Sequence, residues 1–148
     1  MAAEDKIREG AQEYLEPGEE ILAAFVARPR GWTQANAGVR GIGQKQQATA
    51  TSGADAAGFS LASPMALAIT PKRLLSFELG ATAGMGHTGD VKALVGEAPL
   101  GEVDAIKVKR LLLGKVVTLT VRGEEFKLEV GAGANVAGVR EAYEEARG

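Results

Sequence analysis

The sequence predicts a mainly β domain in which about seven short strands form an open barrel or sandwich, with an amphipathic helix near each end of the chain. Three observations support this prediction. Apolar and polar residues alternate with a period of two over most of residues 65–130, as in strands that bury one face. Turn-forming glycines and a proline separate these stretches. The last residues follow helical spacing instead.

The bulk composition is that of one globular domain, which we expect to span residues 1–148. The chain has 148 residues, of which 45% are hydrophobic and 24% charged, and its net charge is −2. This balance provides no overall attraction to nucleic acid. The absence of cysteine excludes disulfides, thiolate catalysis and cysteine-based zinc sites. The charged N-terminal residues do not resemble a signal peptide, and no apolar run reaches the ~18 residues of a spanning helix, so we expect a cytoplasmic protein.

The N-terminal residues predict a helix followed by a first strand. We expect an amphipathic helix over residues 2–15, ended by Pro17 and Gly18. Its apolar stripe consists of Ile7, Ala11, Tyr14 and Leu15. Residues 20–28 then alternate as a strand, although their alanines and leucine are also compatible with a helix. The apolar face of this strand consists of Ile21, Ala23, Phe25 and Ala27.

Residues 29–64 show no clear period. They are rich in Gly, Ala, Gln, Thr and Ser, with isolated large apolar side chains. We interpret them as a long, partly mobile loop inserted between the first two strands. A loop of this length inside a compact domain is usually either functional or disordered.

The segment Met65–Leu79 predicts a hairpin whose two strands join through Thr70–Arg73. Pro71 supplies the backbone angle that a tight turn requires. A second Gly-rich loop over residues 80–90 follows, and then a strand that ends near Pro99.

Three further alternating strands are expected over residues 105–111, 115–121 and 125–130. Gly114 and the segment 122–124 supply the turns between them. A helix over residues 135–146 closes the domain, with Asn135 as its N-cap. Its apolar stripe consists of Val136, Val139 and Tyr143.

The hairpin also carries a family resemblance. It contains the pattern L-x-x-T-x-x-R-L-x-x-F, at Leu67, Thr70, Arg73, Leu74 and Phe77. This pattern resembles the hairpin of bacterial pleckstrin-homology-like and GRAM-like domains. Residues 15–20 and 98–103 are similar to the "L-x-P-G-E" and "I-P-L-x-D-I" segments of those domains.

The resemblance implies a seven-stranded open barrel capped by the C-terminal helix, to which this chain adds an N-terminal helix and the 29–64 insert. It also implies a non-catalytic binding module that mediates protein interaction or self-assembly, with an anionic membrane surface as a further partner. Exposed edge strands pair with other chains, and lipid-independent oligomerisation is the alternative function.

The first candidate contact surface is the inserted loop, because the resemblance implies that the first inter-strand loop receives a ligand. Its candidate residues are Arg28, Arg30, Trp32, Arg40 and Lys45. Cations beside an amphipathic ring suit an anionic lipid surface. The alternative is a solvated loop with Trp32 placed over the barrel.

The second candidate contact surface is the hairpin over residues 107–115. Its candidate residues are Lys109, Arg110, Leu112, Leu113 and Lys115. Leucines at a hairpin tip between cations dock on anionic membranes or on protein partners. Alternatively, the leucines complete the core strand and the lysines form its solvated face.

No residue set predicts catalysis, a cofactor or a metal. His87 is the only histidine, and only Asp90 is a nearby carboxylate. Ser76 falls within a strand and has no nucleophile turn. The G-x-G after residue 130 lacks the third glycine and the following strand of a dinucleotide site. An enzyme would therefore need an unrecognised site in the 80–90 loop, with a pocket at His87 and Asp90.

Overall fold

A computed structural model describes residues 3–29, 52–62, 64–80, 90–111, 114–131 and 134–147. The helices are α1 (Ala3–Ala11) and α4 (Val136–Arg147), with short 3-10 helices at Gln12–Tyr14 and Leu100–Glu102. The strands are β1 (Ala23–Pro29), β2 (Met65–Ile69), β3 (Arg73–Leu79), β4 (Val91–Pro99), β5 (Val103–Leu111), β6 (Gly114–Val121) and β7 (Glu124–Val130).

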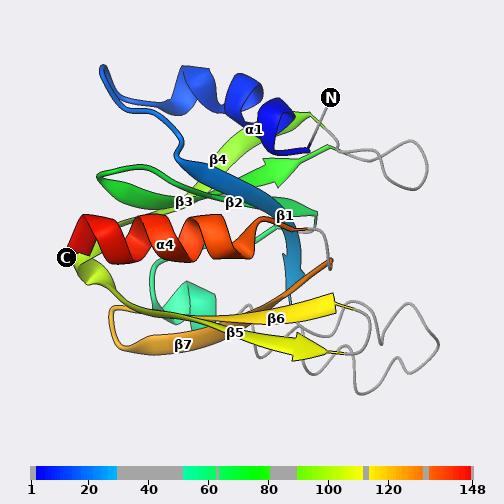
Figure 1. The fold of residues 1–148 in the computed structure, drawn as a ribbon, viewed down its shortest axis with the longest axis vertical. Helices are drawn as coiled ribbons and strands as arrows, with labels where there is room; N and C mark the ends of the chain where they lie inside the picture. Colours follow the sequence, from blue (N-terminus) through cyan, green and yellow to red (C-terminus); the bar gives the residue numbers. More distant parts are fainter. Residues whose placement is uncertain are drawn as a thin grey trace.

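The seven strands form one antiparallel sheet in the order β4-β3-β2-β1-β7-β6-β5. β1 joins its two halves, since residues 23–27 pair with β2 whereas Arg28 and Pro29 pair with β7. The sheet bends at this strand, and α4 lies across the open side between the two halves (Figure 1). The predicted seven-stranded open barrel with a C-terminal helix and an additional N-terminal helix is therefore confirmed.

The main core fills the space between the two half-sheets and α4. Its large buried side chains include Phe25, Met65, Leu67, Ile69, Leu119 and Leu128. The predicted stripe of α4 faces this core, and Val136, Val139 and Tyr143 are buried there. Period-2 alternation and helical spacing thus identified the inward faces of these elements.

A second apolar cluster lies on the outer face of β2 and β3, where α1 covers the sheet (Figure 1). β2 is buried on both faces: Met65, Leu67 and Ile69 face the main core, whereas Ala66 and Ala68 belong to the outer cluster. Ala66 and Ala68 share this cluster with Ile7 and Ala11 of α1, whose closest neighbours in the sheet are β1 and β4.

Two sequence expectations about the N-terminal segment need correction. The α-helix ends at Ala11, and residues 12–14 continue as a 3-10 helix rather than as the end of an α-helix to residue 15. Ile21 precedes β1 and packs in the outer cluster, whereas Ala23, Phe25 and Ala27 face the main core. Ile21 therefore does not share a face with these three residues, because the alternation starts only where the strand starts.

Residues 52–62 of the segment between β1 and β2 contribute three buried side chains to the main core. They include one helical turn at residues 52–56, and Ala54, Ala57 and Phe59 are buried. The Phe59 ring stacks on Phe126 with 5.8 Å between centroids. The sequence showed no period here because one turn and a single bridge are too short to produce one.

Candidate functional site

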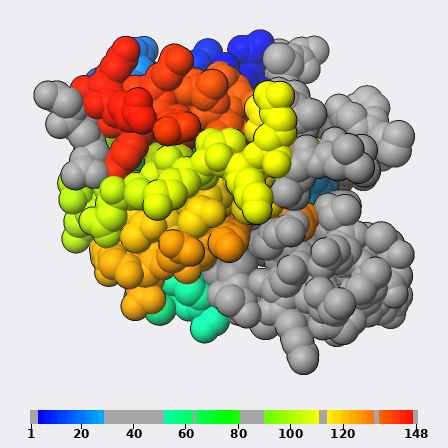
Figure 2. All heavy atoms as spheres, turned by 60° about the horizontal axis from the view of Figure 1, so that its bottom comes forward, coloured from blue at the N-terminus to red at the C-terminus, as the bar shows by residue number. Residues whose placement is uncertain are grey.

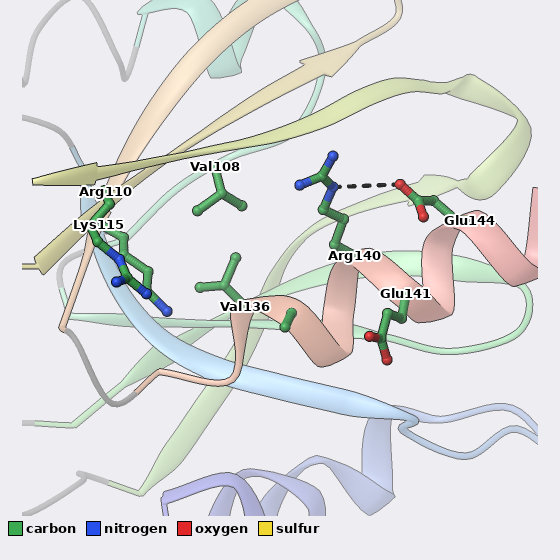
Figure 3. A pocket seen from close by; sticks show the side chains of 8 residues that line it. Val108, Arg110, Lys115, Val136, Arg140, Glu141 and Glu144 are labelled. Atoms are coloured by element: carbon green, nitrogen blue, oxygen red, sulfur yellow. Dashed lines mark ion pairs between the residues drawn. The ribbon is translucent and has the colours of Figure 1, made fainter.

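A hollow of about 480 Å³ lies between β5, which is one edge of the sheet, and the N-terminal half of α4. Figure 2 shows the two elements next to each other on the surface, with α4 in red and orange and β5 in yellow. Figure 3 shows the side chains that line the hollow. These are Val108, Arg110, Lys115, Val136, Ala137, Arg140, Glu141 and Glu144.

Hydrogen bonds join one end of α4 to β5 and the other end to α1. The buried Tyr143 hydroxyl donates a hydrogen bond to the Val103 carbonyl at the start of β5. At the other end, Asn135 Oδ1 accepts from the Gly138 amide at 3.1 Å, which is the predicted N-cap. Asn135 Nδ2 also donates to Glu4 Oε2 of α1 at 2.7 Å. The hollow opens beside the later residues of β5, and Val108 and Val136 approach it from opposite walls (Figure 3).

One end of the hollow is cationic. Arg110 and Lys115 are directly opposite each other in the β5–β6 register. Both lie on the inward face, since Arg110 is two residues after Val108, and Lys115 is two residues before the buried Val117. Their side chains extend together toward the hollow (Figure 3). Neither forms an ion pair within the part of the chain that the structure describes.

The other end of the hollow has mixed charge. Arg140 forms an ion pair with Glu144 one helical turn later, with 3.5 Å between nitrogen and oxygen. Figure 3 shows the Glu141 side chain on the other side of α4 from the Arg140–Glu144 pair. The hollow therefore runs from two cations, past apolar side chains, to a part of α4 that carries the Arg140–Glu144 ion pair and the Glu141 carboxylate.

A buried ionic network explains the hairpin motif. Arg73 at the start of β3 donates to both carboxylate oxygens of Glu19, from Nη2 at 2.8 Å and from Nε at 2.9 Å. The Thr70 hydroxyl donates to Glu19 Oε2 at 2.7 Å. The hydrogen bonds from Arg73 are the main reason why the pKa of Glu19 is lowered to about 2. Burial acts in the opposite direction, and hydrogen bonds from the Glu16 amide and the Thr70 hydroxyl lower the pKa further. The Glu19 side chain is 0% exposed and that of Arg73 12% exposed, so the network is structural.

The turn that presents Glu19 follows from its sequence. Pro17 and Gly18 occupy its central positions, Gly18 has φ of 81°, and the Glu19 amide donates to the Glu16 carbonyl at 2.9 Å. The Glu19 ion pair and hydrogen bonds thus join the segment before β1 to the β2–β3 hairpin. Thr70 and Arg73 of the motif hold the fold together, and they do not form a ligand site.

Comparison with known proteins identifies the fold. No family model and no curated protein matches the chain. Among solved structures, the chain is similar to a pleckstrin homology domain from Shewanella amazonensis SB2B. That match has a TM-score of 0.50 and 15% sequence identity, and covers 97% of each chain. The chain has a pleckstrin-homology-like fold.

A second solved structure is a DUF1696 family protein with a pleckstrin-homology domain from Shewanella loihica PV-4. It is 12% identical, with a TM-score of 0.47 over 95% of this chain and 93% of that one. The match to the Shewanella amazonensis domain shows the pleckstrin-homology part of the predicted resemblance as a fold. The GRAM-like part remains a resemblance of the hairpin motif alone.

Within this pleckstrin-homology-like fold, the predicted contact residues fall in different places. Arg110 and Lys115 lie in the hollow, whereas Lys109 is exposed on the other face of β5. Arg28 is half-buried in β1, at the register position opposite Glu129 of β7. Outside the described residues lie Arg30, Trp32, Arg40, Lys45, Leu112 and Leu113.

Sequence reasoning did not identify the residues that α4 contributes to the hollow. Ala137, Arg140 and Glu141 appear in the sequence as the solvated face of an amphipathic helix. Only the position of α4 beside β5 brings them to a concave surface. The adjacent cations in residues 107–115 were the one available signal, and two of them line the hollow.

The residues considered from the sequence for metal binding or catalysis have the following surroundings in the described part of the chain. No cluster of His, Asp or Glu among them could hold a metal ion. Ser76 is buried, and its hydroxyl donates to the Ser60 carbonyl at 2.7 Å. Asp90 pairs with Lys6 at 3.4 Å, and His87 lies outside the described residues. Within the same ranges, no helix is both long and apolar enough to span a membrane.

Proposed function

We propose that this protein is a non-catalytic binding module that takes up an extended segment of a protein partner along β5, with side chains of the segment in the hollow against α4. The observation that carries the proposal is the position of the hollow directly beside an edge strand. An edge strand offers backbone groups to an added strand, and pockets beside it select alternate side chains.

The two sides of β5 differ in a way that supports this proposal. On one side β5 pairs with β6 over its whole length, from Val103 to Leu111. On its other side no strand pairs with it within the described ranges of the chain. Val108, Val136 and Ala137 provide apolar surface there, and burying it would add to the hydrogen bonds of the new strand.

The proposal is tested by closing the hollow. Ala137 is exposed on α4 and lines the hollow, so Ala137→Trp should fill it without disturbing the core. The matched control is Ala146→Trp, at an exposed position of the same helix that does not line it. A displayed library of random ten-residue peptides is selected on each protein. We expect enriched peptides to bind the original protein and Ala146→Trp, and to lose at least tenfold in affinity for Ala137→Trp.

Two results would contradict the proposal. One is a library that yields no peptide above background on the original protein. The other is a set of peptides that bind Ala137→Trp and Ala146→Trp equally. Self-assembly through β5 is measured separately by light scattering, where a multimer dissociated only by Ala137→Trp would identify a second copy as the bound segment.

A second candidate function is adsorption to an anionic membrane, because Lys107 and Lys109 are both exposed on the outward face of β5. Each basic residue near an anionic surface contributes ~1 kcal/mol. Phosphatidylglycerol vesicles should therefore co-sediment the protein at low salt, and less so with Lys107→Gln and Lys109→Gln together than with Lys92→Gln, an exposed lysine of β4 in the other half of the sheet. No co-sedimentation at low salt would exclude this candidate.

A further inference from the structure

We infer that the segment bound along β5 is acidic at one defined position: it places a carboxylate against Arg110 and Lys115, two residues before an aliphatic side chain that enters the hollow beside Val108. This inference rests on the proposed function and specifies the chemistry of its partner. It follows from three features of the site, which concern charge, spacing and strand direction.

The charge feature is the pair of like charges. Directly opposite residues on one face of an antiparallel pair lie close together, and like charges there are destabilising. Arg110 and Lys115 occupy such positions, and no carboxylate pairs with either in the described ranges. An incoming carboxylate would relieve their repulsion and accept charge-assisted hydrogen bonds from both. The free protein therefore has an unneutralised site for one anionic group.

The spacing feature follows from the strand period. Val108 and Arg110 are two residues apart on the same face of β5. An added strand has the same period, so its side chains on this face also lie two residues apart. If one of them is the carboxylate at Arg110, the next one lies at Val108. There the surroundings are apolar, since Val136 and Ala137 of α4 complete the wall.

The direction feature follows from the sheet. Every strand pair in this sheet is antiparallel. Antiparallel pairing is slightly more stable per residue than parallel pairing. In an antiparallel partner, the residue beside Arg110 comes before the residue beside Val108. The expected order is therefore acidic, any residue, aliphatic.

The test uses three capped nine-residue peptides with a serine and threonine background. The first has glutamate at its fourth position and isoleucine at its sixth, the second exchanges these two residues, and the third replaces glutamate by glutamine. Binding is followed by fluorescence anisotropy of a labelled N-terminus. We expect the first peptide to bind roughly tenfold more tightly than each of the others, as one charge-assisted hydrogen bond allows.

Protein variants locate the carboxylate. The double substitution Arg110→Gln and Lys115→Gln should weaken the glutamate peptide roughly tenfold and leave the glutamine peptide unchanged. Lys127→Gln, at an exposed position on the outward side of β7, is the control for general charge and should change neither affinity. Circular dichroism establishes that each variant is folded.

The outcomes separate this inference from the proposed function. If the glutamine peptide binds as tightly as the glutamate peptide, and Ala137→Trp abolishes both, the acidic preference is wrong although the hollow binds a segment. If all three peptides are insensitive to Ala137→Trp, the proposed function itself is wrong. If phosphatidylglycerol vesicles bind through Arg110 and Lys115 while no peptide binds, the anionic group is a lipid headgroup, and the inference of a protein segment is overturned.

Discussion

At the scale of single residues, the most informative feature is that the motif carrying the resemblance forms a buried ion pair. Glu19 and Arg73 are 54 positions apart in the chain, yet they share two hydrogen bonds. Arg73 also pairs with Glu97 of β4 and donates to the Tyr14 carbonyl at 3.0 Å. One guanidinium thus connects the segments before β1, at β3 and in β4.

Removing the Glu19 charge should destabilise the protein. In Glu19→Gln the Arg73 guanidinium loses its main partner while remaining largely buried, and we expect a loss of about 3 kcal/mol in the free energy of unfolding. Urea unfolding at pH 7 measures it. Glu145→Gln removes an exposed carboxylate and should have almost no effect. Equal stability of the two variants would contradict a structural role for the pair.

The same carboxylate predicts a pH dependence. The Glu19 pKa is about 2 in the folded protein and 4.5 in its ordinary range. Its stabilisation, ~3 kcal/mol, is therefore fully present above pH 4.5 and is lost as the pH falls toward 2. Urea unfolding of the original protein should show this loss between those pH values. The Glu19→Gln variant should lose less of its free energy of unfolding over the same pH interval. Equal losses in the two proteins would show that Glu19 does not cause this pH dependence.

Gly96 of β4 illustrates a second kind of constraint. A Cβ at this position would lie 2.7 Å from Ser76 Oγ and 2.8 Å from the Ser60 carbonyl oxygen. Gly96→Ala should cost roughly 1–3 kcal/mol, because residues 59–60 would have to move away from β4. Gly101→Ala is the control, since nothing lies within 4 Å of its added Cβ. Chemical denaturation compares the two, and a neutral Gly96→Ala would show that the contact relaxes freely.

At the scale of elements, α1 covers the sheet, and its side chains also form hydrogen bonds with backbone groups at the start of β1. Its Glu4 Oε2 accepts from the Ala24 amide at 3.1 Å, and its Arg8 Nη2 donates to the Leu22 carbonyl at 2.7 Å. β1 pairs with β7 only through Arg28 and Pro29. Glu4 and Arg8 therefore bond backbone groups at the start of β1 and just before it. The helix therefore protects part of a strand from pairing with other chains.

The anchor of α1 is Ile7, which is fully buried in the outer cluster. Ile7→Ala should lower the free energy of unfolding by roughly 2–5 kcal/mol if α1 unfolds with the sheet. Hydrogen exchange should show faster exchange in residues 4–11 and at Ala24. Glu9→Ala, on the exposed side of the helix, should leave both measurements unchanged. An unaltered exchange pattern in Ile7→Ala would show that the cluster does not hold α1.

At the scale of the whole molecule, one core joins the two half-sheets. β1 belongs to both halves, and the main cluster includes side chains from β2 and β3 as well as from β6 and β7. The helix α4 closes this core through Val139 and Tyr143. The halves should therefore fold as one cooperative unit.

A substitution in each half tests this cooperativity. Leu119→Ala in β6 should cost roughly 2–5 kcal/mol. Leu119→Ala and Glu19→Gln should each shift a single unfolding transition. Circular dichroism and tyrosine fluorescence should give the same midpoint for that transition. Thr118→Ala in β6, whose side chain is not in the core, serves as the control for strand propensity. Two separate unfolding transitions in Leu119→Ala or in Glu19→Gln would contradict one shared core.

The order of elements was predictable because the later strands alternate apolar and polar residues and because turn residues separate neighbouring strands. Hairpins at Thr70–Arg73 and Arg122–Glu124 were predicted from local turn residues alone, and Asn135 was identified as a helix cap. The core role of Phe59 was not predictable, because it depends on a single bridge to Gly96 and on the ring of Phe126. Such contacts join distant segments and leave no local pattern.

The candidate site was predictable only in part. The sequence alone determined the seven strands, the approximate place of the two terminal helices and the group of cations that includes Arg110 and Lys115, because periodicity and charge are local properties. The tertiary structure decided which of these cations share a face, and that α4 stands beside β5 to form a hollow with them. The physical reason is that a concave surface requires two elements, and their separation depends on how the shared core packs.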